Sequence, residues 1–158
     1  MDRLEFVMLR LSKLTDYAVV VLVQLSQGSG VQTSPGVSAT TGIPEPTVAK
    51  VLKALAGGGL VASQRGAHGG YRLMRPLAAV PIADVIAAID GPIALTACVE
   101  GAAGGCDVEG ICPMRGRWDP VNDAIQQALT NITLADMQEA SIPRAFRLPA
   151  RAPISVAE

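Results

Sequence analysis

Aromatic residues and histidine are scarce in this sequence. Phe, Trp and Tyr together make up 3% of the 158 residues, although hydrophobic residues reach 49%. A core with so few rings must be filled mainly by Ala, Val, Leu and Ile, as in small helical proteins. His68 is the only histidine, which leaves few candidates for a general base.

Long uncharged apolar runs and a secretory signal are also missing. The apolar run at residues 17–25 is too short to span a bilayer. The N-terminal stretch MDRLEFVMLRL is charged and lacks the apolar region and cleavage site of a signal peptide. We therefore expect a cytoplasmic protein without a membrane partner, whose odd number of cysteines, three, stays reduced.

The net charge of −1 conceals an uneven distribution of charge along the chain. Residues 1–75 carry eight basic and four acidic side chains, whereas residues 76–158 carry five basic and ten acidic ones. A basic first half favours contact with a polyanion such as nucleic acid.

The first half has the pattern of a helix-turn-helix. After a short leader at residues 1–8, we expect a helix over 14–27 with Thr15 as a candidate N-cap. A helical piece at 37–41, a break at Gly42 and a second helix over 46–56 follow, with Pro44 and Pro46 at or before its first turn. Helix, glycine-containing turn and helix is the arrangement of this motif.

A β-hairpin is expected directly after the helix-turn-helix. The extended runs LVASQR and YRLMR flank a glycine-rich turn. A basic hairpin at this place predicts a wing. The fold class is therefore mainly α, a winged helix-turn-helix domain over residues 9–91 that ends with a helix at 82–90.

The winged-helix interpretation predicts which side chains touch DNA. The second helix enters the major groove, and the wing reaches the backbone or the minor groove. The candidate contacts are Arg10, Lys13, Glu45, Thr47, Lys50, Lys53, Arg65, His68 and Arg72. The alternative is an ordinary helical hairpin whose charges are only solvated.

The second half contains all three cysteines and one longer helix. The helix is expected over 117–131, with apolar positions every three or four residues that are either core or a partner interface. Thr133 and Asp136 have capping-box spacing. Pro143, Pro149 and Pro153 predict a disordered tail over 141–158.

Cys98, Cys106 and Cys112 are separated by spacers rich in glycine and acidic residues. Such a loop can fold back so that three thiolates converge on a soft metal or an iron–sulfur cluster. Gaps of seven and five residues fit structural zinc poorly, because its paired ligands lie two to four residues apart. Cluster sites tolerate such longer spacers, so the spacing is compatible with a cluster, and a zinc-stabilised adaptor that does not bind DNA is the alternative.

An enzyme or electron-transfer protein is disfavoured. The sequence contains no nucleotide-binding glycine motif and no Cys-x-x-Cys run. We therefore expect no catalytic residues.

Three stretches resemble one family of regulators: LSKLTDYAVVVLVQLS, TGIPEPTVAKVLKALAGGGLV and SQRGAHGGYRL. Together with the cysteine triplet they are similar to winged-helix regulators of the IscR/NsrR type, most closely those of SUF iron–sulfur assembly. The resemblance covers about residues 9–137. It implies a homodimer on a palindromic operator and a cluster-dependent repressor of iron–sulfur assembly genes, with nitric-oxide or redox sensing as the alternative.

The resemblance also implies roles for the second half of the chain. Residues 92–116 would bind the cluster, 2Fe-2S rather than 4Fe-4S, and residues 117–140 would form the dimerisation helix and its cap. The implied dimer contacts are Trp118, Val121, Ile125, Leu129 and Ile132.

The fourth ligand of the cluster is the position where the family pattern is broken. IscR-like proteins have a histidine three residues after the third cysteine, but this chain has Arg115, whose guanidinium cannot ligate. Asp107, Glu109, solvent or a small thiol are alternatives. The Thr15-Asp16 step matches NsrR-like relatives, in which the aspartate ligates the cluster of the opposite subunit, so Asp16 is the preferred fourth ligand.

Overall fold

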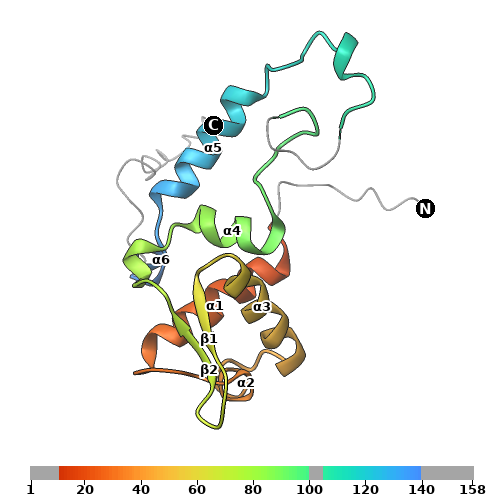
Figure 1. The fold of residues 1–158 in the computed structure, drawn as a ribbon. Coiled ribbons are helices and arrows are strands. Elements are labelled where there is room, and N and C mark those ends of the chain that lie inside the picture. The colour runs from red at the N-terminus through yellow and green to blue at the C-terminus, as the bar shows by residue number, and fades with distance from the viewer. Residues whose placement is uncertain (1–10, 100–104, 140–158) are drawn as a thin grey trace, which may run out of the picture.

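The computed structural model describes residues 11–99 and 105–139, and Figure 1 shows their arrangement. The leader at 1–8, Arg10 and the tail at 141–158 lie outside the described residues. The helices are α1 (Lys13–Gln27), α2 (Ser34–Thr41), α3 (Glu45–Gly57), α4 (Ile82–Asp90), α5 (Asp119–Asn131) and α6 (Leu134–Gln138). The strands are β1 (Val61–Gln64) and β2 (Gly70–Leu73), and short 3-10 turns occupy Leu77–Ala79 and Glu109–Ile111. The mainly helical fold with one hairpin is confirmed.

Residues 11–91 form a unit that we call the reading head. Its core is aliphatic, as the shortage of aromatic residues predicted: Leu22 of α1 and Leu52 and Leu55 of α3 are completely buried. Val80 and Val85 close this core from the side of α4. Because apolar residues recur on one face of each helix, α1, α3 and α4 pack around a common interior.

The start of α1 differs from the prediction. Ser12, not Thr15, is the N-cap, since its side chain accepts a hydrogen bond from the Thr15 amide. Thr15 is 2% exposed, and its hydroxyl donates to Asp90 Oδ2 at 2.7 Å. The threonine is therefore a tertiary contact between α1 and the end of α4, and its prediction as a cap was wrong.

The helix-turn-helix is confirmed at α2 and α3. Thr33 caps α2, which therefore begins at Ser34, three residues before the predicted start. Gly42 has the left-handed φ of 76° that the tight turn requires. Pro44 precedes α3 as its cap, and Pro46 lies in its first turn, where no helical amide bond is lost.

The hairpin of β1 and β2, which we call the wing, is anchored by Gln32. Val61 pairs with Leu73, and Gln64 with Gly70. The backbone of Gln32 exchanges two hydrogen bonds with Tyr71, of 2.9 and 2.7 Å. The Gln32 side-chain amide also donates to the carbonyl of Gln24 at 3.1 Å, near the end of α1. One residue thus joins the wing to α1.

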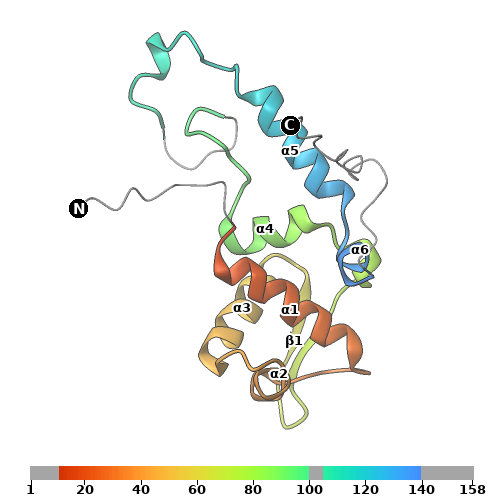
Figure 2. The same cartoon turned by 180° about the vertical axis from the view of Figure 1, so that it is seen from behind.

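The second half leaves the reading head and returns to it. Figures 1 and 2 both show α5 and the turn before it projecting away from the wing. α4 has the predicted bounds, but α5 begins at Asp119, two residues later than predicted, with Trp118 as its cap. After α5 the chain returns to the reading head, where the Ile132 carbonyl accepts a hydrogen bond from the Ile82 amide at 2.8 Å. The predicted Thr133–Asp136 capping box is present.

Within the described residues, no helix combines the length and apolar character that crossing a membrane would need.

Candidate functional site

The solvent-facing side of α3 carries the candidate base-reading residues. Glu45, Lys50 and Lys53 are exposed, and Thr47 is half-buried. The opposite face of the same helix is buried in the core. The 3.6-residue period therefore turns these four polar side chains outward, as an element entering a DNA groove requires.

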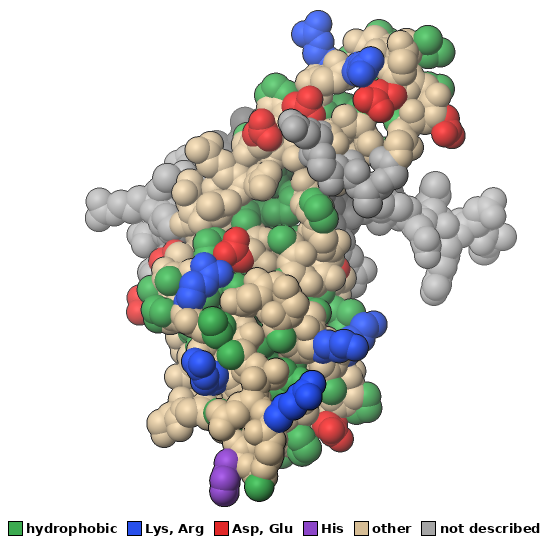
Figure 3. Space-filling model, in the orientation of Figure 1, with side chains coloured by type: hydrophobic (Ala, Val, Ile, Leu, Met, Phe, Trp, Pro, Cys, Tyr) green, Lys and Arg blue, Asp and Glu red, His purple; other side chains and the backbone are tan. Residues whose placement is uncertain are grey.

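The wing presents the second group of candidate contacts. Arg65, His68 and Arg72 are all exposed. Gly66 at the tip has a φ of 111°, which allows the chain to reverse between the two strands. Figure 3 shows several separate Lys and Arg side chains on the lower half of this face, with Asp or Glu side chains among them. Such a surface attracts phosphate.

Lys13 is positioned at the start of α1 by an aromatic neighbour. Its Nζ lies 5.3 Å from the centre of the Tyr17 ring. Hydrogen bonding to Tyr17 raises the pKa of Lys13 above its ordinary value of 10.5. Like any exposed lysine, Lys13 is charged at neutral pH, so it can serve as a phosphate contact.

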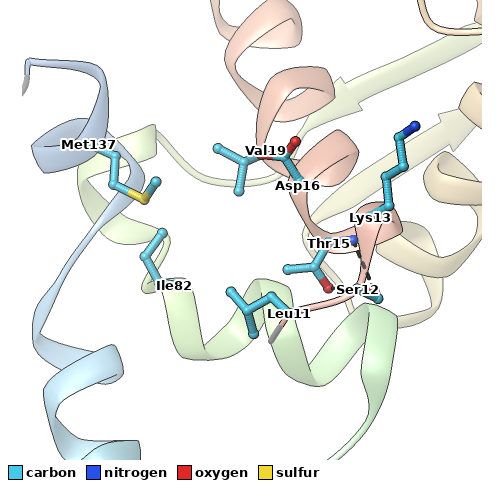
Figure 4. A pocket seen from close by; sticks show the side chains of 8 residues that line it. All are labelled: Leu11, Ser12, Lys13, Thr15, Asp16, Val19, Ile82 and Met137. Atoms are coloured by element: carbon cyan, nitrogen blue, oxygen red, sulfur yellow. Dashed lines mark hydrogen bonds between the residues drawn. The ribbon is translucent and has the colours of Figure 1, made fainter. Parts of the chain in front are cut away.

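Asp16 is exposed and lines an open cavity of about 480 Å³. Figure 4 shows this cavity between the start of α1, Ile82 of α4 and Met137 of α6. Its remaining wall includes Leu11 and Val19. An oxygen donor thus lies beside a largely apolar opening on the surface of the reading head.

The three cysteines lie in the cysteine segment, which we define as residues 92–118. All three thiols are free and half-buried. Cys98 Sγ lies 3.2 Å from the Thr96 hydroxyl, whereas Cys106 and Cys112 flank the 3-10 turn at Glu109–Ile111. Free thiols have the donor chemistry that an iron–sulfur cluster requires.

The described residues do not bring these donors together. Among them, no three His, Cys, Asp or Glu side chains are grouped closely enough to hold a metal ion, and residues 100–104 of the same loop lie outside the description. The donor set therefore fits a cluster chemically, and its convergence stays a prediction.

Arg115 occupies the position at which the family pattern has histidine. Its side chain is exposed, and its Nε lies 3.7 Å from Glu109 Oε1. This ion pair engages one of the alternative carboxylate donors of the loop. Being permanently protonated, the guanidinium cannot bind iron.

The predicted dimer stripe on α5 divides into two parts. Trp118 and Val121 are 41% and 44% exposed, whereas Ile125, Leu129 and Ile132 are half-buried. Leu129 and Ile132 pack against the core of the reading head. The end of the stripe nearer the cysteines is thus free to contact another surface, and the other end contributes to the fold.

Two buried polar side chains beside the cysteine segment, those of Asn122 and Thr15, were not identified as important from the sequence. Asn122 of α5 is 4% exposed, and the side chain of Thr15 is bonded to Asp90. A polar residue next to the apolar stripe of α5 was the only available signal for Asn122. Nothing in the sequence links Thr15 to a carboxylate 75 residues away.

Comparison with known proteins gives a consistent result. The family model Rrf2, described as an iron-dependent transcriptional regulator, matches residues 11–140. The HTH-type transcriptional regulator IscR of Cronobacter sakazakii is 32% identical over 131 residues, which cover 82% of this chain and 80% of that protein.

Two solved structures are similar over most of their length. CymR, the global cysteine regulator of B. subtilis, is 26% identical with a TM-score of 0.62, covering 85% of this chain and 100% of that one. The IscR of T. potens is 26% identical with a TM-score of 0.59, covering 89% of this chain and 93% of that one. The chain therefore belongs to the Rrf2 family and is a DNA-binding transcriptional regulator of the IscR type, not an enzyme.

Proposed function

We propose that this regulator acts as a homodimer, senses an iron–sulfur cluster and represses the genes of iron–sulfur cluster assembly. The observation that carries the proposal is the attachment of three free thiols to a helix-turn-helix reading head within one chain. The cysteines supply a sensor, and the basic face supplies a DNA-binding surface. This organisation disfavours the zinc-stabilised adaptor, which would have no use for that surface.

On DNA, α3 enters the major groove and the wing contacts the adjacent backbone. Lys50 and Lys53 are exposed on the recognition helix, and Arg65 and Arg72 on the wing. A twofold dimer places two recognition helices about 34 Å apart, on successive turns of the duplex. The operator is therefore a palindrome, because its symmetry must match that of the protein.

The dimer forms through the exposed end of α5. Trp118 and Val121 are large apolar residues on the surface of a single chain. Burying such side chains against a second copy removes apolar area from water and favours association. In this assignment, residues 9–91 bind DNA, residues 92–116 bind the cluster and residues 117–140 form the dimerisation helix and its cap.

Cys98, Cys106 and Cys112 hold the cluster, of the 2Fe-2S type, and Asp16 of the partner subunit completes the ligand set. When bound, the cluster supplies a redox-active and dissociable group. A carboxylate oxygen beside three thiolates is a weak, replaceable ligand. Because Asp16 lies on α1 of a reading head, ligation across the dimer ties the position of that head to the state of the sensor.

Anaerobic purification with counts of iron and sulfide tests the cluster. We expect visible thiolate–iron absorbance in the wild type and its loss in Cys98→Ser. Asp16→Asn should retain a cluster that is lost faster in air, whereas Asp123→Asn, which changes an exposed aspartate of α5, should behave as the wild type. A colourless protein loaded with zinc would contradict the proposal.

Gel shifts on the promoter of an iron–sulfur assembly operon test the regulation. We expect salt-sensitive binding whose affinity differs between apo and cluster-loaded protein. If neither form shifts the promoter, the proposed repression is wrong, and if both bind it equally, the proposed sensing by the cluster is wrong.

A further inference from the structure

The side chain of Asn122 is a buried clamp on the cysteine segment. Its Nδ2 donates to the Ile93 carbonyl at 3.1 Å, and its Oδ1 accepts from the Leu95 amide at 3.0 Å. The side chain thus bonds to alternate residues of the passing chain, as a neighbouring strand would. Asn122 is 4% exposed, so its side of these two part-buried bonds is shielded from competing water.

The clamp lies next to the first cysteine. Leu95 is followed by Thr96, whose hydroxyl lies 3.2 Å from Cys98 Sγ. The carbonyl of Thr96 accepts from the Val99 amide at 3.5 Å, and Val99 is 4% exposed. Cys98 therefore lies in a short turn between the residues held by the Asn122 clamp and a buried valine.

The start of this segment is held as well. Asp90, the last residue of α4, accepts a hydrogen bond from the buried hydroxyl of Thr15 on α1. Residues 90–95 are thus bonded to α1 at one end and to α5 at the other. Thr15 is also the direct neighbour of Asp16 in the first turn of α1.

We propose that Asn122 is a positioning residue for Cys98, which holds its thiol at a defined place relative to both α1 and α5. The inference rests on the proposed function, because it assigns to this clamp the transmission of the state of the cysteine site to the reading head. Asn122 itself contacts no cluster ligand. It acts through residues 93–95 and the turn that carries Cys98.

A bond that only stabilised the fold would have different consequences. Its loss would lower the free energy of unfolding and alter the three cysteines alike. A positioning residue changes the reactivity of the one thiol that it places, in protein that is fully folded. The experiment therefore measures each cysteine separately.

Alkylation of the full-length, reduced, metal-free protein by iodoacetamide provides this readout, with the rate at each cysteine followed by mass spectrometry. In Asn122→Ala we expect the rate at Cys98 to rise by about tenfold, as the loss of two part-buried hydrogen bonds implies. The rates at Cys106 and Cys112 should stay as in the wild type. Gln126→Ala, which removes an exposed amide from the same helix, is the matched control.

Asn122→Asp provides a second variant in case the alanine substitution prevents folding. Its carboxylate can still accept from the Leu95 amide but cannot donate to Ile93, and it places a negative charge against that carbonyl, so we expect an increase at Cys98 at least as large as that in Asn122→Ala. Equal acceleration at all three cysteines, or none at Cys98 in either folded variant, would overturn the proposal.

Operator affinity in the apo and cluster-loaded forms tests the transmission. We expect the ratio of the two affinities to move towards one in Asn122→Ala and to keep its wild-type value in Gln126→Ala. A wild-type ratio in Asn122→Ala would refute the transmission. If the wild type takes up no cluster, the proposed function fails by itself, and the alkylation rates alone then decide whether Asn122 positions Cys98.

Discussion

The reading head and the cysteine segment differ in how much apolar surface they bury. In the reading head, the completely buried Leu22, Leu52 and Leu55 lie at the centre of a continuous aliphatic core. In the described part of the cysteine segment, Val99 is the only buried hydrophobic residue, and Ile111 is 85% exposed. The first region gains its stability from its own apolar contacts. The second has too little buried surface to do so, and its order depends on clamps, ligands or a partner.

The largest expected effect is a loss of unfolding free energy when a large apolar side chain is truncated in the reading head but not in the cysteine segment. Leu52→Ala should lower the free energy of unfolding by about 2–5 kcal/mol, because it leaves a cavity in a completely buried site. Ile111→Ala should change it by less than about 0.5 kcal/mol. Urea denaturation followed by circular dichroism at one protein concentration measures both. Comparable losses would mean that the cysteine segment has a core of its own.

Substituting one glycine in each region, Gly70 and Gly110, compares how closely the backbone is packed in the two regions. A Cβ on Gly70 would lie 2.5 Å from the Gln32 carbonyl oxygen, at a φ of 152°. Gly70→Ala should therefore cost about 1–3 kcal/mol. Gly110 has open space around it, so Gly110→Ala should be close to neutral. Thermal unfolding of the two variants tests this, and a neutral Gly70→Ala would contradict the close packing of the wing on Gln32.

The hydrogen bond from Thr15 to Asp90 connects α1 to the end of α4, just before the cysteine segment, and a substitution at Thr15 tests its contribution. Thr15→Val keeps the shape of the side chain but removes the hydroxyl that donates to Asp90, and should cost about 1 kcal/mol in unfolding free energy. Thr130→Val, on the exposed side of α5, is the control and should cost less. Hydrogen exchange at residues 91–95 should also accelerate in Thr15→Val only. Unchanged exchange there would show that the bond does not hold this part of the chain.

The smallest expected effect concerns charge. Arg72→Ala on the wing should weaken operator binding a few-fold and lower the slope of log affinity against log salt by about one. Arg115→Ala in the cysteine segment, also an exposed arginine, should leave the slope unchanged. Filter binding over a range of salt concentrations measures both. A lower slope in Arg115→Ala would extend the DNA surface into the cysteine segment.

The sequence was most informative where local signals coincide. The predicted bounds of α4, 82–90, are those of the structure, with Gly91 directly after its end, and Gly42 marked the turn between α2 and α3. These features depend on residues close in the chain, whose backbone preferences act in the same way in any fold. The prediction of a winged helix combined such local features with the basic residues of the hairpin.

The errors and omissions arise where distant residues decide. Thr15 has the right chemistry for a cap, but Ser12 takes that role, and the threonine hydroxyl serves Asp90 instead. The stripe of α5 was recognised, but periodicity could not show that Leu129 packs on the reading head while Trp118 stays exposed. In the cysteine segment, the glycine-rich spacers impose no single backbone path. The spacing of its cysteines therefore predicts donors and not their arrangement.

The anchoring of the wing by Gln32 has a consequence for how such a regulator can change during evolution. The tilt of the hairpin is set close to its turn, by the bonds from Gln32 to Tyr71, which pairs with Ser63, and to the last turn of α1. The exposed tip at residues 65–68 takes no part in those bonds. Under the proposed mode of DNA binding, substitutions at the tip can therefore alter which phosphates or bases are touched while the reach of the hairpin stays constant. A duplicated copy of the gene could acquire a new operator through changes at the tip, without repacking the domain.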